Sequence, residues 1–161
     1  MELLTRCLNW GADDYNSALI RAAMHCHYLI ANQMVKLGAN CYDDAMEWAA
    51  RSGCQIIVDQ MLELGAGKCP YKRTPTKTDS YSSAMVAAAK YGHENIVNQM
   101  LDLMNDKMLP ECDTSYRLLM ERKYVYEKAL KYASKGEHWE IFDRMDILIT
   151  NLDDIIYCQD L

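Results

Sequence analysis

An internal repeat constrains this chain more than any other feature. The pattern Tyr-x-x-Ala-(Leu/Met)-x-x-Ala-(Ala/Ser) occurs four times, beginning at Tyr15, Tyr42, Tyr81 and Tyr126. Each copy continues to an apolar pair, and three residues beyond that pair stands a methionine: Met34, Met61, Met100 and Met145. Matched positions at a recurring spacing are typical of repeat architectures, so the pattern predicts a series of similar structural units.

Each copy reads as two short helices. In the first helix the repeated apolar positions fall at i, i+1, i+4 and i+5, which places them on one stripe of an α-helix. In the second, Ile57, Val58 and Met61 share a face in the same way. A two-helix unit cannot bury such a stripe alone, so neighbouring copies should pack together. The expected fold class is therefore an all-α helical solenoid whose methionines fill the core rather than line a groove.

The expected organisation is a single repeat domain over residues 1–161. Repeats are predicted at 11–37, 38–64, 65–104 and 124–149, with a partial first unit at 1–10 and a C-terminal cap at 150–161. Insertions are predicted at 67–79 and 105–123, because the spacing of the repeated tyrosines grows along the chain. The first insertion contains Pro70 and Pro75 and is polar, which predicts an exposed loop. Residues 116–120 are expected to add a helical turn.

The third copy is the one that most resembles a known repeat. Residues 88–101 read AAKYGHENIVNQML, and this resembles the ankyrin repeat, in which a first helix ending in Ala-Ala is followed by Gly-His-x-x-Val-Val-x-x-Leu-Leu. The Tyr-x-x-Ala-Met opening is most similar to the degenerate short ankyrin-like repeats of large DNA viruses. The resemblance implies an ankyrin-like solenoid that binds other proteins without catalysis, including host proteins if the chain is viral.

The copies depart from the ankyrin pattern in two ways. A 27-residue spacing leaves too little chain for the β-hairpin fingers of ankyrin repeats, so these fingers are expected to be short or missing. The turn between the two helices carries Gly53 and Gly92 in copies two and three, where a positive φ favours glycine. Cys26 and Glu137 occupy that position in copies one and four. The sequence leaves open whether these two turns keep the same conformation.

Composition limits the classes of binding partner and the cellular compartment that we expect for this chain. The formal net charge is −6, from 17 basic and 23 acidic residues, which argues against nucleic acid and anionic membranes as partners. No run approaches the ~18–20 apolar residues of a membrane helix, and the first residues lack a signal-peptide layout. Seven cysteines occur without Cys-x-x-Cys pairing, so reduced thiols and a cytoplasmic location are expected, with the virion as a second possible location.

The histidines, cysteines and glycines that could form a catalytic, metal or phosphate site do not occur in a pattern that predicts one. His25-Cys26-His27 offers zinc ligands, but adjacent residues on a helical turn point apart and no second ligand pair follows. His27, His93 and His138 share one repeat position, which favours a structural role. No phosphate-binding glycine motif and no strained nucleophile turn occurs. We therefore predict no enzyme activity, catalytic residue, cofactor or metal.

The expected function is protein–protein binding by a chain that is monomeric unless it belongs to a larger assembly. In ankyrin-type stacks the partner meets the exposed side of the first helices and the loops. Carried over to this chain, the resemblance assigns to partner binding the helical residues Ile20, Asp43, Asp44, Glu47 and Val86. The positively charged loop adds Lys68, Tyr71, Lys72, Arg73 and Lys77. The alternative is a structural subunit of a larger assembly such as a virus particle.

Overall fold

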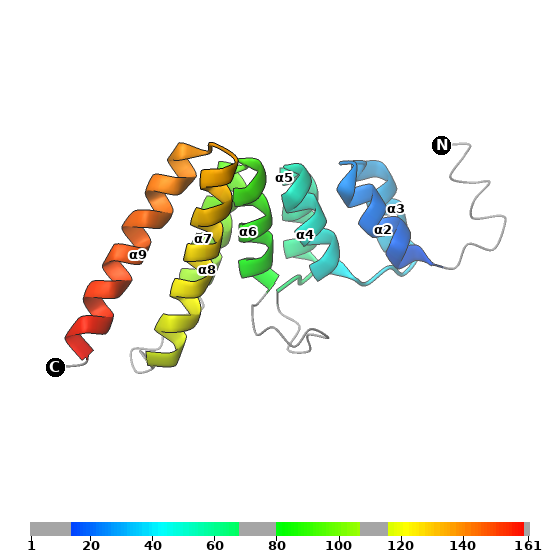
Figure 1. The fold of residues 1–161 in the computed structure, drawn as a ribbon. Helices are drawn as coiled ribbons and strands as arrows, with labels where there is room; N and C mark the ends of the chain where they lie inside the picture. The colour runs from blue at the N-terminus through cyan, green and yellow to red at the C-terminus, as the bar shows by residue number, and fades with distance from the viewer. Residues whose placement is uncertain (1–13, 68–79, 107–115, 160–161) are drawn as a thin grey trace. The chain divides into compact units, whose positions relative to one another are not determined.

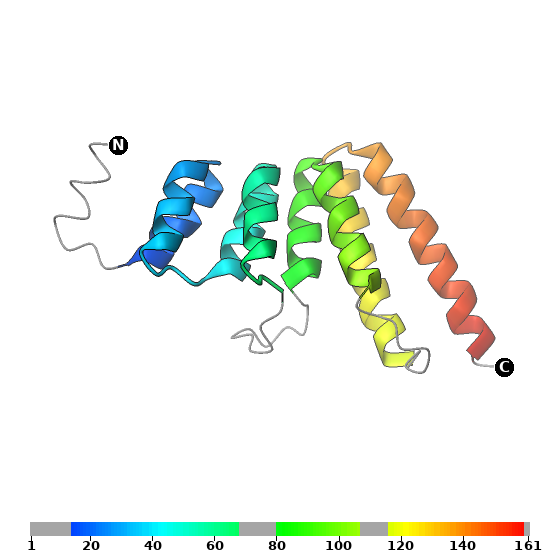
Figure 2. The same ribbon diagram turned by 180° about the vertical axis from the view of Figure 1, so that it is seen from behind.

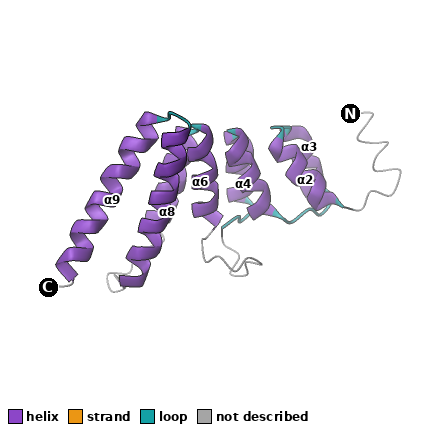
Figure 3. Cartoon of the chain, viewed as in Figure 1, coloured by secondary structure: helices purple, strands orange, loops and turns teal. Residues whose placement is uncertain are grey.

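The computed structural model describes residues 14–67, 80–106 and 116–159, and all regular structure in these ranges is α-helical (Figures 1 and 3). The predicted all-α class is confirmed for this part of the chain. The partial unit at 1–10 and residues 68–79 of the first insertion lie outside the described residues. The chain divides into two compact units, Met1–Cys69 (unit 1) and Pro70–Leu161 (unit 2). The single repeat domain stays a prediction.

Unit 1 consists of two helical hairpins that lie side by side. Its helices are α2 (Tyr15–Met24), α3 (Tyr28–Lys36), α4 (Tyr42–Ser52) and α5 (Gln55–Glu63). The first helices α2 and α4 pack together on one side, and α3 and α5 contact each other on the other side (Figures 1 and 2). Apart from Ala18, which is half-buried, the alanines at the predicted stripe positions are buried between these layers, together with Leu19, Met46 and Met61. Small side chains let the helices approach closely at this seam.

Unit 2 repeats this arrangement with longer final helices. It contains α6 (Ser80–Tyr91), α7 (Glu94–Asp106), α8 (Tyr116–Lys135) and α9 (Trp139–Gln159). The first helices α6 and α8 pack together, and α7 contacts α9. The repeated methionines Met100 and Met145 are fully buried, as are Met61 and almost all of Met34 in unit 1, which confirms their predicted interior position.

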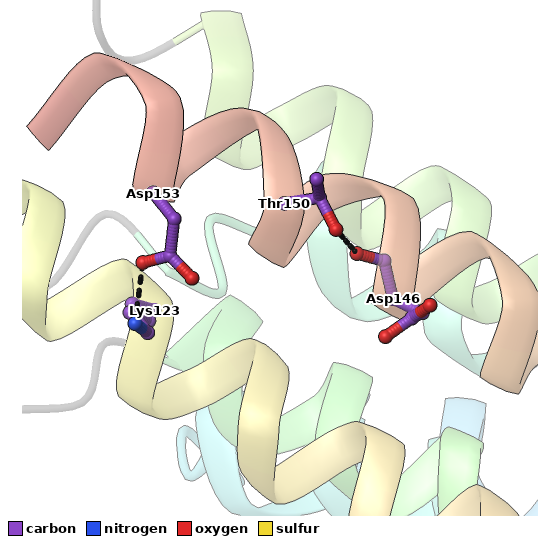
Figure 4. Close-up of polar contacts among 4 residues, drawn as sticks. All are labelled: Lys123, Asp146, Thr150 and Asp153. Atoms are coloured by element: carbon purple, nitrogen blue, oxygen red, sulfur yellow. Dashed lines mark hydrogen bonds and ion pairs between the residues drawn. The ribbon is translucent and has the colours of Figure 1, made fainter. Parts of the chain in front are cut away.

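The last two helices extend beyond the predicted boundaries. Helix α8 has 20 residues and begins at Tyr116, so the helical turn expected inside the 105–123 insertion is continuous with the repeat. Helix α9 has 21 residues and runs through most of the predicted 150–161 cap. The extensions are tied together by an ion pair between Lys123 and Asp153, close to the point where the Thr150 hydroxyl donates to the Asp146 backbone carbonyl (Figure 4).

All four turns between the paired helices have the same backbone structure. The carbonyls of Ala22, Ala49, Ala88 and Ala133 each accept a hydrogen bond from the N–H five residues later, at 2.8, 2.9, 3.0 and 3.0 Å. The residue before each donor is left-handed: φ is 55° at Cys26, 75° at Gly53, 76° at Gly92 and 59° at Glu137. Cys26 and Glu137 therefore keep the glycine conformation, at a backbone cost of about 1–2 kcal/mol each.

Candidate functional site

The structure places the helical members of the predicted partner surface on first helices of both units. Ile20 lies on α2, three of the residues lie on α4, and Val86 lies on α6 of unit 2. Asp44 and Glu47 are exposed, whereas Ile20 and Val86 are half-buried. Asp43 is also half-buried, and its carboxylate accepts a 2.6 Å hydrogen bond from the Gly67 N–H. Asp43 therefore shapes the chain after α5, and the exposed acidic pair Asp44 and Glu47 remains available.

The loop members of that predicted surface are Lys68, Tyr71, Lys72, Arg73 and Lys77, and all of them lie outside the described residues.

A polar link joins the two hairpins of unit 1. The side-chain carbonyl of Asn16 accepts hydrogen bonds from the N–H groups of Asn40 and Cys41, at 2.8 and 3.3 Å. The Cys41 thiol donates in return to the Asn16 backbone carbonyl at 3.4 Å. Burial, followed by the nearby Asp44 carboxylate, raises the pKa of Cys41 to about 11. At neutral pH this group is thus a protonated hydrogen-bond donor rather than a nucleophilic thiolate.

Sequence reasoning missed an apolar edge in unit 1, formed by Tyr28, Leu29 and Ile56. These side chains are 39%, 75% and 63% exposed. Leu29 and Ile56 occupy the same position in successive copies, the second residue of α3 and of α5. Because α3 and α5 contact each other, these positions belong to one side of the unit. The detectable signal was an aliphatic residue directly before the apolar pair of the repeat in both copies.

The equivalent positions in unit 2 are Glu94-Asn95 and Trp139-Glu140, and three of these residues line a pocket. A cavity of about 360 Å³ is lined by the starts of α7 and α9, including Glu94, Glu137, Trp139 and Glu140. A hydrogen bond with the Glu94 carboxyl, and then the charge of that group, raise the pKa of Glu140. Trp139 is 58% exposed and meets Phe142 edge to face, with ring centroids 5.8 Å apart. This acidic pocket concentrates negative charge where unit 1 presents aliphatic side chains.

Neighbouring turns touch within each unit, and the two contacts differ in chemistry. In unit 1 Cys26 and Cys54 form a disulfide, with their Cα atoms 5.4 Å apart. In unit 2 the His138 ring covers Gly92 so closely that a Cβ added to the glycine would lie 2.6 Å from ring atoms. The two contacts pair the same repeat positions. In each, the left-handed residue of one copy (Cys26 or Gly92) meets the residue that follows the left-handed position in the next copy (Cys54 or His138).

The expectation that all thiols are reduced is wrong for Cys26 and Cys54. Their separation of 28 residues is one repeat period plus one residue, so packing of adjacent copies brings them together. The sulfur of Cys26 is therefore not a free thiolate, and His25-Cys26-His27 loses the ligand that most favoured a zinc site. The His25 and His27 rings lie 6.0 Å apart. Across the described residues no group of three His, Cys, Asp or Glu side chains is placed to hold a metal ion.

Among the described helices, none combines the length and the apolar character needed to span a bilayer. Comparison of the chain with protein-family models, with curated proteins and with solved structures found no match.

Proposed function

We propose that this chain is a non-catalytic protein-binding module built on an ankyrin-like series of helical pairs. The observation that carries the proposal is a contrast between buried and exposed repeat positions. The methionine position is the same in four copies, whereas the two residues that open the second helix differ every time. They are Tyr28-Leu29, Gln55-Ile56, Glu94-Asn95 and Trp139-Glu140. In repeat proteins, constant positions support packing between copies, and exposed positions that vary supply recognition.

The surface of unit 1 suggests the chemistry of the partner. The apolar edge offers Leu29 and Ile56 to an aliphatic or aromatic contact, and Asp44 and Glu47 are exposed on the first helix. A partner with an apolar centre and basic flanking groups would complement both features. As a free adaptor the chain would act as a monomer in the cytoplasm, in a host cell if its ankyrin-like resemblance reflects viral origin.

The alternative is a structural subunit of a larger assembly such as a virus particle. It is favoured by α9, where Ile147, Ile155 and Tyr157 are 60%, 45% and 68% exposed. Apolar side chains distributed along one long helix suit contact with another chain in an assembly.

Matched surface variants separate the two functions. Proximity labelling in producing cells should identify the neighbours of the wild-type chain and of two variants, Leu29→Asp/Ile56→Asp and Ile147→Asp/Ile155→Asp. For an adaptor, the first variant loses a defined neighbour and the second keeps it. For a structural subunit, the second variant leaves the assembly and the first stays in it. Unchanged helical circular dichroism is the control for folding, and identical neighbours for all three proteins would contradict a binding role for either surface.

The insertion gives a second test of the adaptor function. Replacing residues 68–77 with a Gly-Ser linker removes Lys68, Tyr71 and the other basic loop residues while leaving the helices intact. We expect an unchanged melting temperature within a few degrees and weaker capture of the neighbour identified above. Full capture would assign recognition to the helices alone.

A further inference from the structure

The disulfide of unit 1 occupies a position that the repeat does not require to be cysteine. The equivalent left-handed residue is Gly53, Gly92 or Glu137 in the other copies. Unit 2 makes its turn-to-turn contact with Gly92 and a histidine ring. Cysteine at position 26 carries the strain of a left-handed conformation that glycine would avoid. The covalent bond is therefore an addition to the repeat, and its presence needs its own explanation.

The two half-cystines differ sharply in access. Cys26 is exposed, whereas Cys54 is only 3% exposed and belongs to the core. A thiol from solvent can therefore approach the bond at Cys26 and not at Cys54. Exposed disulfides are more readily reduced than buried ones.

In unit 1 each second helix begins directly after a turn that the disulfide joins. Neither His27 before α3 nor Cys54 before α5 caps its helix with a side-chain hydrogen bond. Leu29 follows Cys26 by three residues, and Ile56 follows Cys54 by two, so both residues of the apolar edge lie within one helical turn of a half-cystine. One further bond joins the same two turns, from the Ser52 hydroxyl to the Ala23 carbonyl at 3.0 Å.

We propose that the Cys26–Cys54 disulfide is a reversible redox clasp that orders the apolar edge of unit 1. With the bond formed, the starts of α3 and α5 are fixed relative to each other, and Tyr28, Leu29 and Ile56 form one surface. With the bond reduced, the turn at residues 25–28 opens and this surface loses its fixed geometry, while the core below stays folded. That the edge binds a partner rests on the proposed function; the clasp itself does not.

The chemistry is thiol–disulfide exchange with a cellular thiol reductant. A reductant thiolate attacks the Cys26 sulfur, forms a mixed disulfide and releases Cys54 as a thiolate, which takes up a proton. A second reductant thiolate then attacks the other sulfur of the mixed disulfide and releases Cys26. The protein disulfide gains two electrons and two protons, and the two reductant thiols become one disulfide. A disulfide oxidant reverses the sequence.

Hydrogen exchange of the whole protein, with no partner present, tests the clasp. Exchange is compared before reduction with dithiothreitol, after reduction, and after reoxidation with oxidised glutathione, with alkylation and mass measurement reporting the thiol state. We expect amides of residues 25–31 to exchange about 10-fold faster after reduction and to recover on reoxidation. Amides around Gly92 in unit 2, where the same turn lacks a disulfide, should not respond.

A matched variant completes the experiment. Cys26→Gly removes the bond and keeps a residue suited to the left-handed turn, so its exchange should be fast and insensitive to dithiothreitol. Three results would overturn the proposal: a bond absent under oxidising conditions, unchanged exchange after verified reduction, or complete loss of protection throughout α2–α5, which would show that unit 1 does not stay folded without the disulfide. If exchange responds as expected but Leu29→Asp/Ile56→Asp keeps every neighbour, the clasp stands and the proposed binding role of the edge fails.

Discussion

The two units use the same backbone turn and join neighbouring turns by different means. In unit 1 the contact is a covalent bond between Cys26 and Cys54, and in unit 2 it is the packing of His138 over Gly92. Their outer surfaces diverge at the same place, since an apolar edge in unit 1 corresponds to an acidic pocket in unit 2. The repeat thus determines which positions meet, whereas the residues at those positions determine how strongly neighbouring turns are joined and which chemistry the surface presents.

The largest expected effect separates the covalent contact from the packed one. Cys54→Ala opens a cross-link spanning 28 residues, and the chain-entropy model gives a loss of about 3.6 kcal/mol from the stability of unit 1. His138→Ala leaves a gap above Gly92, with a loss of about 1–2 kcal/mol. Denaturant-dependent hydrogen exchange, read separately in each unit, measures both. Equal losses would mean that the bond adds nothing beyond packing.

Truncating a core methionine should lower stability by the same amount in both units, because the two cores share one pattern. Met61 and Met100 occupy the same repeat position and are both fully buried. We expect Met61→Ala and Met100→Ala each to destabilise their own unit by about 2–4 kcal/mol. The control is Met120→Ala, since Met120 is 42% exposed and its truncation should have little effect. A large difference between the two buried sites would show that the units are not packed alike.

Two glycines with positive φ differ in the space around them, and alanine substitutions at both should measure the contact between Gly92 and His138. Gly65 has φ 102° with open space around it, whereas Gly92 has φ 76° with the His138 ring against it. Gly65→Ala should cost about 1 kcal/mol for the backbone conformation alone. Gly92→Ala should cost about 2–3 kcal/mol, because overpacking adds to the same backbone term. His138→Ala in the Gly92→Ala background should recover part of that loss, and strict additivity in this double-mutant cycle would contradict the contact.

The smallest effect is a pH response confined to unit 1. Because the folded pKa of Cys41 is raised from 9.0 to about 11, its contribution to stability is complete below pH 9 and is lost as pH rises toward 11. At pH 8 the folded thiol should react with iodoacetamide roughly 100-fold more slowly than in the unfolded chain. Alkylation followed by peptide mass spectrometry measures this rate. A rate equal to that of the unfolded chain would place Cys41 in water.

The helices and the core could be predicted from sequence because their signals are local and repeated. The apolar stripes and the methionine position recur in every copy, so each copy supports the interpretation of the others. The extended start of α8 was only partly visible, since residues 116–120 look helical but nothing local shows that they continue into the repeat. Helix α9 passes the predicted cap boundary because its extra turns follow contacts with α8 such as Lys123–Asp153.

The surface contacts could not be predicted because they pair unlike positions of successive copies. The repeat alignment compares Cys26 with Gly53, whereas the packed structure brings Cys26 to Cys54. In the same way Glu94 opens α7, but its partner Glu140 is the second residue of α9. Offsets of this kind depend on how neighbouring hairpins pack, and no alignment of the copies contains that information. For the same reason Asp43 looked like an exposed binding residue until its bond to Gly67 was located.

The uniform turn also affects how such a chain can change over evolution. Each contact between turns draws its two members from different copies, on a backbone that already accepts glycine, cysteine or glutamate at the left-handed position. Substitutions at two sites are then enough to exchange a covalent link for a purely steric one, with no rebuilding of either helix. The strength of the link between two adjacent copies can therefore change without a change in the fold of either copy, and selection can act on each turn-to-turn contact separately.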